Sequence, residues 1–192
     1  MKTIELIKSL ERFNKPFYSI ADLEKITGLS KDSLYVTIKR LVDKGILERI
    51  GKGIYRLFTA KPSTENIAAS LYMPNYLSFE SALSRYGVFN LIPYTLTFAT
   101  TRKTKRLTVE GRDVEFRQIK KELFWGYDIQ GGIYISKPEK AFLDLVYLAS
   151  RGMAVLDLDE LDTKKLSMAT VKELSKRFPI YTQKYLDKII SS

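Results

Sequence analysis

Residues 30–45 constrain the fold more than any other part of the sequence, because their pattern predicts an amphipathic helix with one side left free. Aliphatic residues recur three and four positions apart, which places them on one side of an α-helix. They are Leu34, Ile38, Leu41 and Val42. Ser30 is a good N-cap, and Gly45 suits the position just beyond the helix end. We therefore expect this helix to pack through its aliphatic side.

At 100° per residue, the opposite side of this helix is mostly polar and available for contact. Its centre carries Asp32, Val36, Lys39 and Asp43, and its flanks carry Ser33, Tyr35 and Arg40. A helix that needed only solubility could carry any charges there. The neighbouring segments therefore decide whether this side binds a partner.

The segments before this helix predict a helix-turn-helix. Residues 2–13 show a helical pattern, which ends before Pro16. Ser19 can cap a second helix that has Asp22 at its third position, and a Thr-Gly turn at residues 27–28 closes it. In a helix-turn-helix, the second helix of the pair enters the DNA major groove with its N-terminus first. The order helix, tight glycine-containing turn, helix thus predicts a DNA-reading element.

A β-hairpin is predicted directly after the helix at residues 30–45. Two short β-rich runs, at residues 46–50 and 54–57, flank a Gly-Lys-Gly turn. In winged helix-turn-helix proteins such a hairpin lies beside the recognition helix, so basic residues are expected at its tip and on one strand face. Arg49, Lys52 and Arg56 fit this expectation. The alternative is a small interaction module that never touches nucleic acid.

Residue chemistry assigns roles within the predicted interface. Lys31 lies in the first helical turn, where free backbone amides can also meet a phosphate. The residues best placed for base edges are Ser33, Tyr35 and Val36, with hydroxyls to hydrogen-bond and a valine to contact a thymine methyl. Lys39 and Arg40 can read guanine or clamp the backbone. Because exposed Lys and Arg are commonly only solvated, the set carries the prediction better than its single members do.

Charge and length agree with a nucleic-acid partner. The chain has 192 residues, 32 of them Lys or Arg and 22 Asp or Glu, for a formal charge of +10. This balance favours polyanionic partners such as nucleic acid or an anionic membrane surface. No apolar run is long enough to span a bilayer, and the first residues lack the apolar region of a signal peptide. We expect a cytoplasmic protein without a membrane partner.

The chain contains neither cysteine nor histidine, which narrows its chemistry. Disulfides, thiolate catalysis, thiolate zinc sites, the Ser-His-Asp triad and imidazole bases are all excluded. A metal-dependent nuclease remains as a poor alternative, and its candidate residues are Asp157, Asp159, Asp162 and Lys164. This acidic segment lacks the ligand spacing and the glycine of an EF-hand. We therefore expect no enzyme activity, no metal and no cofactor.

The remaining two thirds predict an α+β domain with a mainly antiparallel sheet. A break at Pro62 is followed by Ser63, which can cap a new helix. Strands are expected at residues 94–101, 107–110, 113–119 and 131–135, and a helix at residues 79–86. Ser136 opens a predicted capping box, and the helix after it is apolar nearly all round. Asp144 inside that helix requires a partner, and a structural bond or ion pair is favoured over catalysis.

Three C-terminal segments resemble the AbiEi antitoxin family of type IV toxin-antitoxin systems. They are YLSFESALSRYG at residues 76–87, IPYTLTFATTRK at residues 92–103 and SKPEKAFLDLVY at residues 136–147, in matching order and spacing. The start of the third segment is the most distinctive, although here Lys137 precedes the proline. The resemblance covers most of the chain. It implies a winged domain that binds inverted repeats in its own promoter and a C-terminal domain that antagonises a nucleotidyltransferase toxin, and we expect the C-terminal motifs to maintain the fold.

A dense basic loop at residues 102–106 has three interpretations. It can be a second DNA contact, a surface for an acidic toxin, or a solvated turn. Its cations are Arg102, Lys103, Lys105 and Arg106. A DNA or partner contact is slightly favoured.

These observations predict an α+β protein, with an N-terminal winged helix-turn-helix domain over residues 1–60 and a mixed α+β C-terminal domain over residues 61–192. The expected function is a sequence-specific transcriptional regulator, an antitoxin that represses its own operon through double-stranded operator DNA and antagonises a nucleotidyltransferase-type toxin. The alternative is a winged-helix transcription factor with no toxin, whose C-terminal domain serves oligomerisation or ligand sensing. The oligomeric state stays open.

Overall fold

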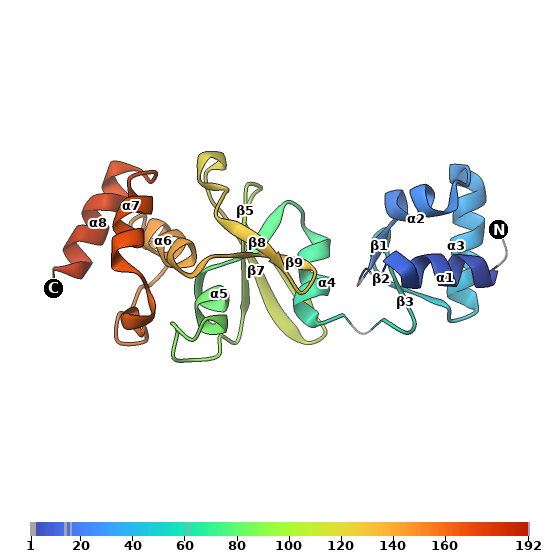
Figure 1. The fold of residues 1–192 in the computed structure, drawn as a ribbon, viewed down its shortest axis with the longest axis horizontal. Coiled ribbons are helices and arrows are strands. Elements are labelled where there is room, and N and C mark those ends of the chain that lie inside the picture. The colour runs from blue at the N-terminus through green and yellow to red at the C-terminus, as the bar shows by residue number, and fades with distance from the viewer. Residues whose placement is uncertain (1–2, 14, 16, 61, 192) are drawn as a thin grey trace. The chain divides into compact units, whose positions relative to one another are not determined.

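The computed structural model describes residues 3–13, 15, 17–60 and 62–191. The chain divides into two compact units, Met1–Leu71 and Tyr72–Ser192, which are called unit 1 and unit 2 below (Figure 1). The boundary expected from the sequence lies after residue 60, at the break around Pro62. The structural division instead follows the next helix, which is thereby grouped with unit 1. Lys2 and Pro16, which the sequence places at the ends of the first helix, lie outside the described residues.

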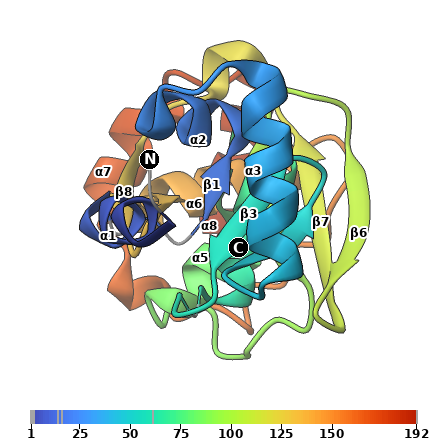
Figure 2. The same cartoon turned by 90° about the vertical axis from the view of Figure 1, so that its right-hand side faces the viewer.

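Unit 1 consists of helices and a small antiparallel sheet. Its elements are α1 (Thr3–Phe13), β1 (Tyr18–Ser19), α2 (Ile20–Thr27), α3 (Lys31–Asp43), β2 (Leu47–Gly51), β3 (Ile54–Leu57) and α4 (Thr64–Leu71). The strand order is β1-β3-β2, with both pairings antiparallel. α3 packs against α2 and β2, and Figure 2 shows α2 beside one end of α3. The predicted winged helix-turn-helix is confirmed.

One apolar core holds unit 1 together. Each helix of the α1–α3 set contributes its aliphatic stripe, and the hairpin strands contribute alternate residues. The most buried members are Leu6, Leu10, Tyr18, Leu23, Leu34, Ile38, Leu41, Leu47, Tyr55 and Leu57. Burial of this apolar surface, at roughly 25 cal/mol per Å², is the main term that fixes α3 in place. The outer side of α3 takes no part in this core.

The caps of two helices follow the sequence prediction only in part. Ser19 Oγ accepts the backbone N–H of Asp22 at 3.1 Å, and the Asp22 carboxylate accepts the N–H of Ser19 at 2.9 Å, so the capping box of α2 is confirmed. Ser30 does occupy the N-cap of α3, but its side chain makes no capping bond. Its hydroxyl instead donates to Ser33 Oγ at 3.1 Å. The side-chain cap predicted for Ser30 is therefore wrong.

Unit 2 is built around a six-stranded mixed sheet of order β6-β7-β5-β4-β9-β8. The strands are β4 (Asn75–Leu77), β5 (Leu96–Thr100), β6 (Lys105–Val109), β7 (Arg112–Gln118), β8 (Tyr127–Gln130) and β9 (Ile133–Ser136). Pairs β6–β7, β4–β5 and β8–β9 are antiparallel, whereas β5–β7 and β4–β9 are parallel. The predicted α+β class with a mainly antiparallel sheet is confirmed.

Helices cover this sheet and close the C-terminal end of unit 2. They are α5 (Phe79–Arg85), η1 (Lys121–Leu123), α6 (Pro138–Ala149), η2 (Thr163–Lys165), α7 (Met168–Ser175) and α8 (Ile180–Ile190). α6 packs against α5, α7 and α8 (Figure 1). No helix among the described residues is long and apolar enough to cross a membrane.

Two local predictions in unit 2 need correction. α6 begins one residue later than predicted, with Lys137 as N-cap and Pro138 in its first turn. Ser136 does not cap it, because the Ser136 hydroxyl donates to the carbonyl of Leu77 on β4 at 3.1 Å. The predicted basic loop at residues 102–106 is also shorter than expected, since Lys105 already lies in β6.

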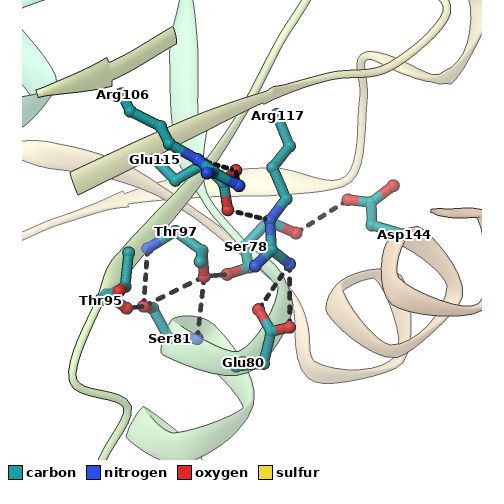
Figure 3. Close-up of polar contacts among 9 residues, drawn as sticks. All are labelled: Ser78, Glu80, Ser81, Thr95, Thr97, Arg106, Glu115, Arg117 and Asp144. Carbon is teal, nitrogen blue, oxygen red and sulfur yellow. Dashed lines mark hydrogen bonds and ion pairs between the residues drawn. The ribbon is translucent and has the colours of Figure 1, made fainter. Parts of the chain in front are cut away.

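A buried polar network ties α6 to the sheet. Asp144, which is fully buried, is bound by Lys140 one turn earlier, by the Tyr76 hydroxyl at 2.8 Å and by the Ser78 hydroxyl at 2.9 Å. Figure 3 shows the bond from Ser78. Burial raises the pKa of Asp144 and lowers that of Lys140, and each partner opposes the shift of the other. The expected structural partner of Asp144 is thus confirmed.

Candidate nucleic-acid interface

The outer side of α3 is exposed along its length. The predicted interface residues on it are all exposed, namely Lys31, Ser33, Tyr35, Val36, Lys39 and Arg40. Val36 keeps 71% of its surface exposed and Tyr35 keeps 47%. Leu34, Ile38 and Leu41 on the opposite side are at most 4% exposed. The helix therefore has one packed side and one open side, as its spacing predicts.

The N-terminus of α3 also offers backbone donors. The first turn of a helix has N–H groups with no partner inside the helix, and they carry the positive end of the helix dipole. Because the Ser30 side chain makes no capping bond here, these amides have no side-chain acceptor from the N-cap residue. Lys31 follows directly and is exposed. This end of α3 can accept an anion such as a phosphate.

The three cations of the wing differ in their exposure and in their bonding partners. Lys52 lies at the exposed tip, between β2 and β3. The Arg56 Nε donates to the Glu48 carboxylate across the hairpin at 2.8 Å, and only 21% of the Arg56 side chain is exposed. The Arg49 side chain is exposed and donates to the carbonyl of Gly51 at 3.3 Å. Of the three predicted wing cations, Arg56 is thus held by an acid within the wing.

The strand register separates the two wing arginines. Glu48 lies opposite Arg56 and Arg49 lies opposite Tyr55, and directly opposed residues point to the same face of a sheet. Arg49 and Arg56 therefore lie on opposite faces of the hairpin, so the expectation of basic residues on one strand face is wrong. The strand register then shifts between Arg49 and Gly51, and no pattern in the sequence predicts this shift.

The wing is joined to the helix-turn-helix by backbone bonds. β1 pairs with β3, and the N–H of Ile20 at the start of α2 donates to the carbonyl of Gly53 at 3.1 Å. α3 continues into β2 through Gly45, whose φ of +66° suits a residue without a side chain. Backbone bonds from β1 and from the start of α2 thus hold the hairpin against the helix-turn-helix.

The predicted cations of unit 2 differ in their surroundings. The Arg102 guanidinium stacks 4.2 Å from the centre of the Tyr72 ring, and Lys105 Nζ lies 5.0 Å from the same centre. Lys103 is exposed. Arg106 instead binds Glu115 at 2.8 Å. Arg106 is therefore engaged, whereas Lys103 is open to solvent.

Arg106 belongs to a chain of alternating charges across the sheet (Figure 3). Glu115 binds both Arg106 and Arg117, and Arg117 also binds Glu80 of α5 at 2.8 Å through both carboxylate oxygens. Burial acts to raise the pKa of Glu115, but the two arginines hold that pKa below its usual value. This chain neutralises its own charges and fixes α5 on the sheet.

Sequence reasoning missed two cations near this loop. Lys120 and Lys121 are exposed and follow β7 after one residue, and the N–H of Gln118, the last residue of β7, donates to the Thr104 hydroxyl at 3.1 Å. The structure thus adds them to the cations of the loop. We call the resulting set, Arg102, Lys103, Lys105, Lys120 and Lys121, the basic edge of unit 2. The signal available in the sequence was the Lys-Lys pair directly after a predicted strand.

The acidic segment proposed for a nuclease has a structural explanation. Asp157 accepts the N–H of Asp159 at 2.9 Å, and Asp162 lies 3.6 Å from Lys165. Within the described ranges of the chain, no three carboxylates gather closely enough to hold a metal ion. This segment gives no support to the nuclease alternative.

A family comparison bears on unit 1. Residues 5–57 match the family model described as "Transcriptional regulator, AbiEi antitoxin". The N-terminal region of the chain belongs to the AbiEi family. The AbiEi match runs from α1 to the end of β3, and so includes α3 and the wing. The C-terminal segments that resemble AbiEi proteins lie beyond this match, and their resemblance stays a prediction. No curated protein sequence matches the chain.

A solved structure shares the fold. The RV2827C protein from Mycobacterium tuberculosis superposes with a TM-score of 0.54, over 94% of this chain and 73% of that chain. The two sequences are 17% identical. At this identity the likeness concerns the fold alone.

Proposed function

We propose that this AbiEi regulator binds operator DNA through unit 1 and represses the operon that encodes it. The observation that carries the proposal is the open side of α3, because its exposed Tyr35 and Val36 lie on a helix whose opposite side is locked into the core. In the docking mode of such folds, the N-terminal half of this helix enters the major groove. Binding to chromosomal DNA takes place in the cytoplasm.

The assigned roles follow from position and chemistry. Ser33, Tyr35 and Val36 meet base edges, while Lys31 and the free amides of the first turn meet a phosphate. Lys39 and Arg40 bind guanine or the backbone. On the wing, Lys52 and Arg49 supply the phosphate contacts, and Arg56 contributes less because Glu48 already binds it. The basic edge of unit 2 supplies a second backbone contact.

The experiment that tests DNA binding is a footprint of the purified full-length protein on the DNA upstream of its own gene. We expect a protected inverted repeat that overlaps the promoter. A double variant, Tyr35→Ala with Val36→Ala, should lose the footprint and keep its far-UV circular dichroism. Thr37→Ala is the matched control on the same helix, because this half-buried residue is outside the predicted set. Equal affinity for the promoter and for unrelated DNA would overturn the proposal.

The antitoxin activity is proposed on the family membership of the N-terminal region and on the C-terminal motifs. We expect that co-expression of the chain relieves the growth arrest caused by a nucleotidyltransferase encoded beside it. The Lys52→Ala variant should still relieve the arrest while binding the operator more weakly, if neutralisation belongs to unit 2. If no such gene is adjacent, the winged-helix transcription factor without a toxin becomes the better description.

A further inference from the structure

One acidic residue stands at the end of α3 that would enter the groove first. Asp32 lies in the first turn of the helix and is exposed. Within the described part of the chain its carboxylate has no hydrogen bond or ion pair. Two other acids of unit 1 are engaged, since Asp22 binds Lys15 at 2.7 Å and Glu48 binds Arg56. The Asp32 carboxylate is thus available to an external donor.

The helix places Asp32 among the residues assigned to base reading. Tyr35 and Val36 follow it by three and four positions, so the three side chains are neighbours on one side of α3. Lys39 continues the same row by one further turn. A carboxylate in this row faces the same groove as the proposed base-reading side chains.

The chemistry of the major groove restricts what such a carboxylate can contact. An ionised carboxylate only accepts hydrogen bonds, and nearby phosphates repel it. Guanine presents only acceptors in this groove, and the amino group of adenine lies beside the acceptor N7. Cytosine presents its N4 amino group and has no acceptor of its own in this groove. A carboxylate therefore binds most favourably opposite cytosine and less favourably opposite the other bases.

We propose that Asp32 is a specificity-determining residue that accepts a hydrogen bond from the N4 amino group of one cytosine in each operator half-site. The proposal rests on the DNA-binding function proposed above and sharpens it. Repulsion between the Asp32 carboxylate and the DNA phosphates lowers the affinity for every sequence, and only the hydrogen bond from the correct base offsets this loss. The residue thus favours selectivity over total affinity.

A role in helix stability makes a different prediction. An acid in the first turn stabilises a helix through the dipole, and this effect does not depend on any DNA sequence. If that were the only role, replacing Asp32 would lower the melting temperature and leave base preference unchanged. Base preference and melting temperature must therefore be measured on the same variants.

The test is selection of binding sites from a randomised DNA library by the full-length protein and its variants. In Asp32→Ala, the preference for cytosine at one position of each half-site should fall roughly tenfold, with other positions unchanged. In Asp32→Asn, preference at that position should shift toward adenine, because an amide can both donate and accept there. Asp32→Asn is nearly isosteric, so it remains informative if the alanine variant folds poorly.

Asp43→Asn is the matched control. Asp43 is an exposed acid in the last turn of the same helix, away from the end that enters the groove. Its replacement should tighten binding to all sequences alike and leave every base preference unchanged. If the wild-type protein selects an operator and Asp32→Asn selects the same one, the inference fails while the DNA-binding function stands. If the wild-type protein selects no sequence at all, both fail.

Discussion

At the residue scale, an ion pair inside the wing decides which cations reach DNA. Glu48 binds Arg56 at 2.8 Å, whereas Lys52 stands at the tip without a described partner. The pairing depends on the strand register, which the sequence leaves open because a register shift between Arg49 and Gly51 precedes the turn. Residue type alone therefore made Arg49, Lys52 and Arg56 look equivalent. The structure ranks them.

This ranking predicts the salt dependence of DNA binding. Lys52→Ala should weaken binding to all sequences and reduce the slope of log affinity against log salt by about one, the value for one lost phosphate contact. Arg56→Ala should change the slope less, because its guanidinium already neutralises Glu48. The measurement is a titration of labelled DNA at several salt concentrations. An unchanged slope for Lys52→Ala would remove the wing tip from the interface.

A second prediction at this scale concerns the buried pair in unit 2. Asp144→Ala leaves the Lys140 ammonium buried without its counter-charge, so the free energy of unfolding of unit 2 should fall by about 3–5 kcal/mol. Urea unfolding followed by the fluorescence of Trp125, which Lys140 contacts at 5.0 Å from the ring centre, measures this loss. The double variant Lys140→Met with Asp144→Leu should lose less than Asp144→Ala alone. An equal or greater loss would show that the charges themselves hold α6 in place.

At the element scale, local signals predicted unit 1 well. The capping box of α2, the aliphatic stripe of α3 and the Gly-Lys-Gly turn each depend on neighbours within a few residues, so the sequence contains them. In unit 2 the parallel pairing of β4 with β9 joins residues far apart in the chain, and no local pattern encodes it. Ser136 shows the same limit of local patterns, because its hydroxyl donates to the carbonyl of Leu77 on β4 and therefore does not cap the helix. β8 was also missed, because the apolar-polar alternation of its sequence, Tyr-Asp-Ile-Gln, extends over only four residues.

The capping box of α2 makes the stability of unit 1 depend on pH. Burial acts to raise the pKa of Asp22, but its bonds to Lys15 and Ser19 hold that pKa below its usual value. The carboxylate therefore stabilises the fold fully above the unfolded value of about 3.9, and this stability is lost as the pH falls through the lower folded value. The difference in melting temperature between the wild type and Asp22→Asn should shrink over that interval. A difference that stays constant with pH would contradict the role of the charge.

At the scale of the whole molecule, positive charge is shared between the two units. Unit 1 carries 13 basic and 8 acidic residues, and unit 2 carries 19 and 14, so each has a net charge of +5. Composition thus predicted a polyanionic partner without saying which surface meets it. In unit 2, Arg106 is paired with Glu115 although 82% of its side chain is exposed, whereas Lys103, Lys120 and Lys121 are exposed with no ion pair among the described residues. The position of each cation in the sheet was needed for that distinction.

The basic edge therefore predicts a contribution of unit 2 to operator affinity. Lys103→Ala combined with Lys120→Ala should weaken binding to operator and unrelated DNA by the same factor and reduce the salt slope by about two. Arg106→Ala is the control, since Glu115 already holds this cation, and its effect should be smaller. Gel-shift titrations on both DNAs measure this. Unchanged affinity in the double variant would show that the basic edge does not contact DNA, and that it meets a protein partner or only solvent.

The separation of the two sides of α3 also bears on how such a regulator changes its target. Leu34, Ile38 and Leu41 hold the helix in the core, and none of them lies on its outer side. Substitutions at Tyr35 or Val36 therefore alter what is read at little cost to folding, as surface changes usually do. A gene duplicate could drift to a new operator through a few such changes, while the scaffold stays under unaltered selection.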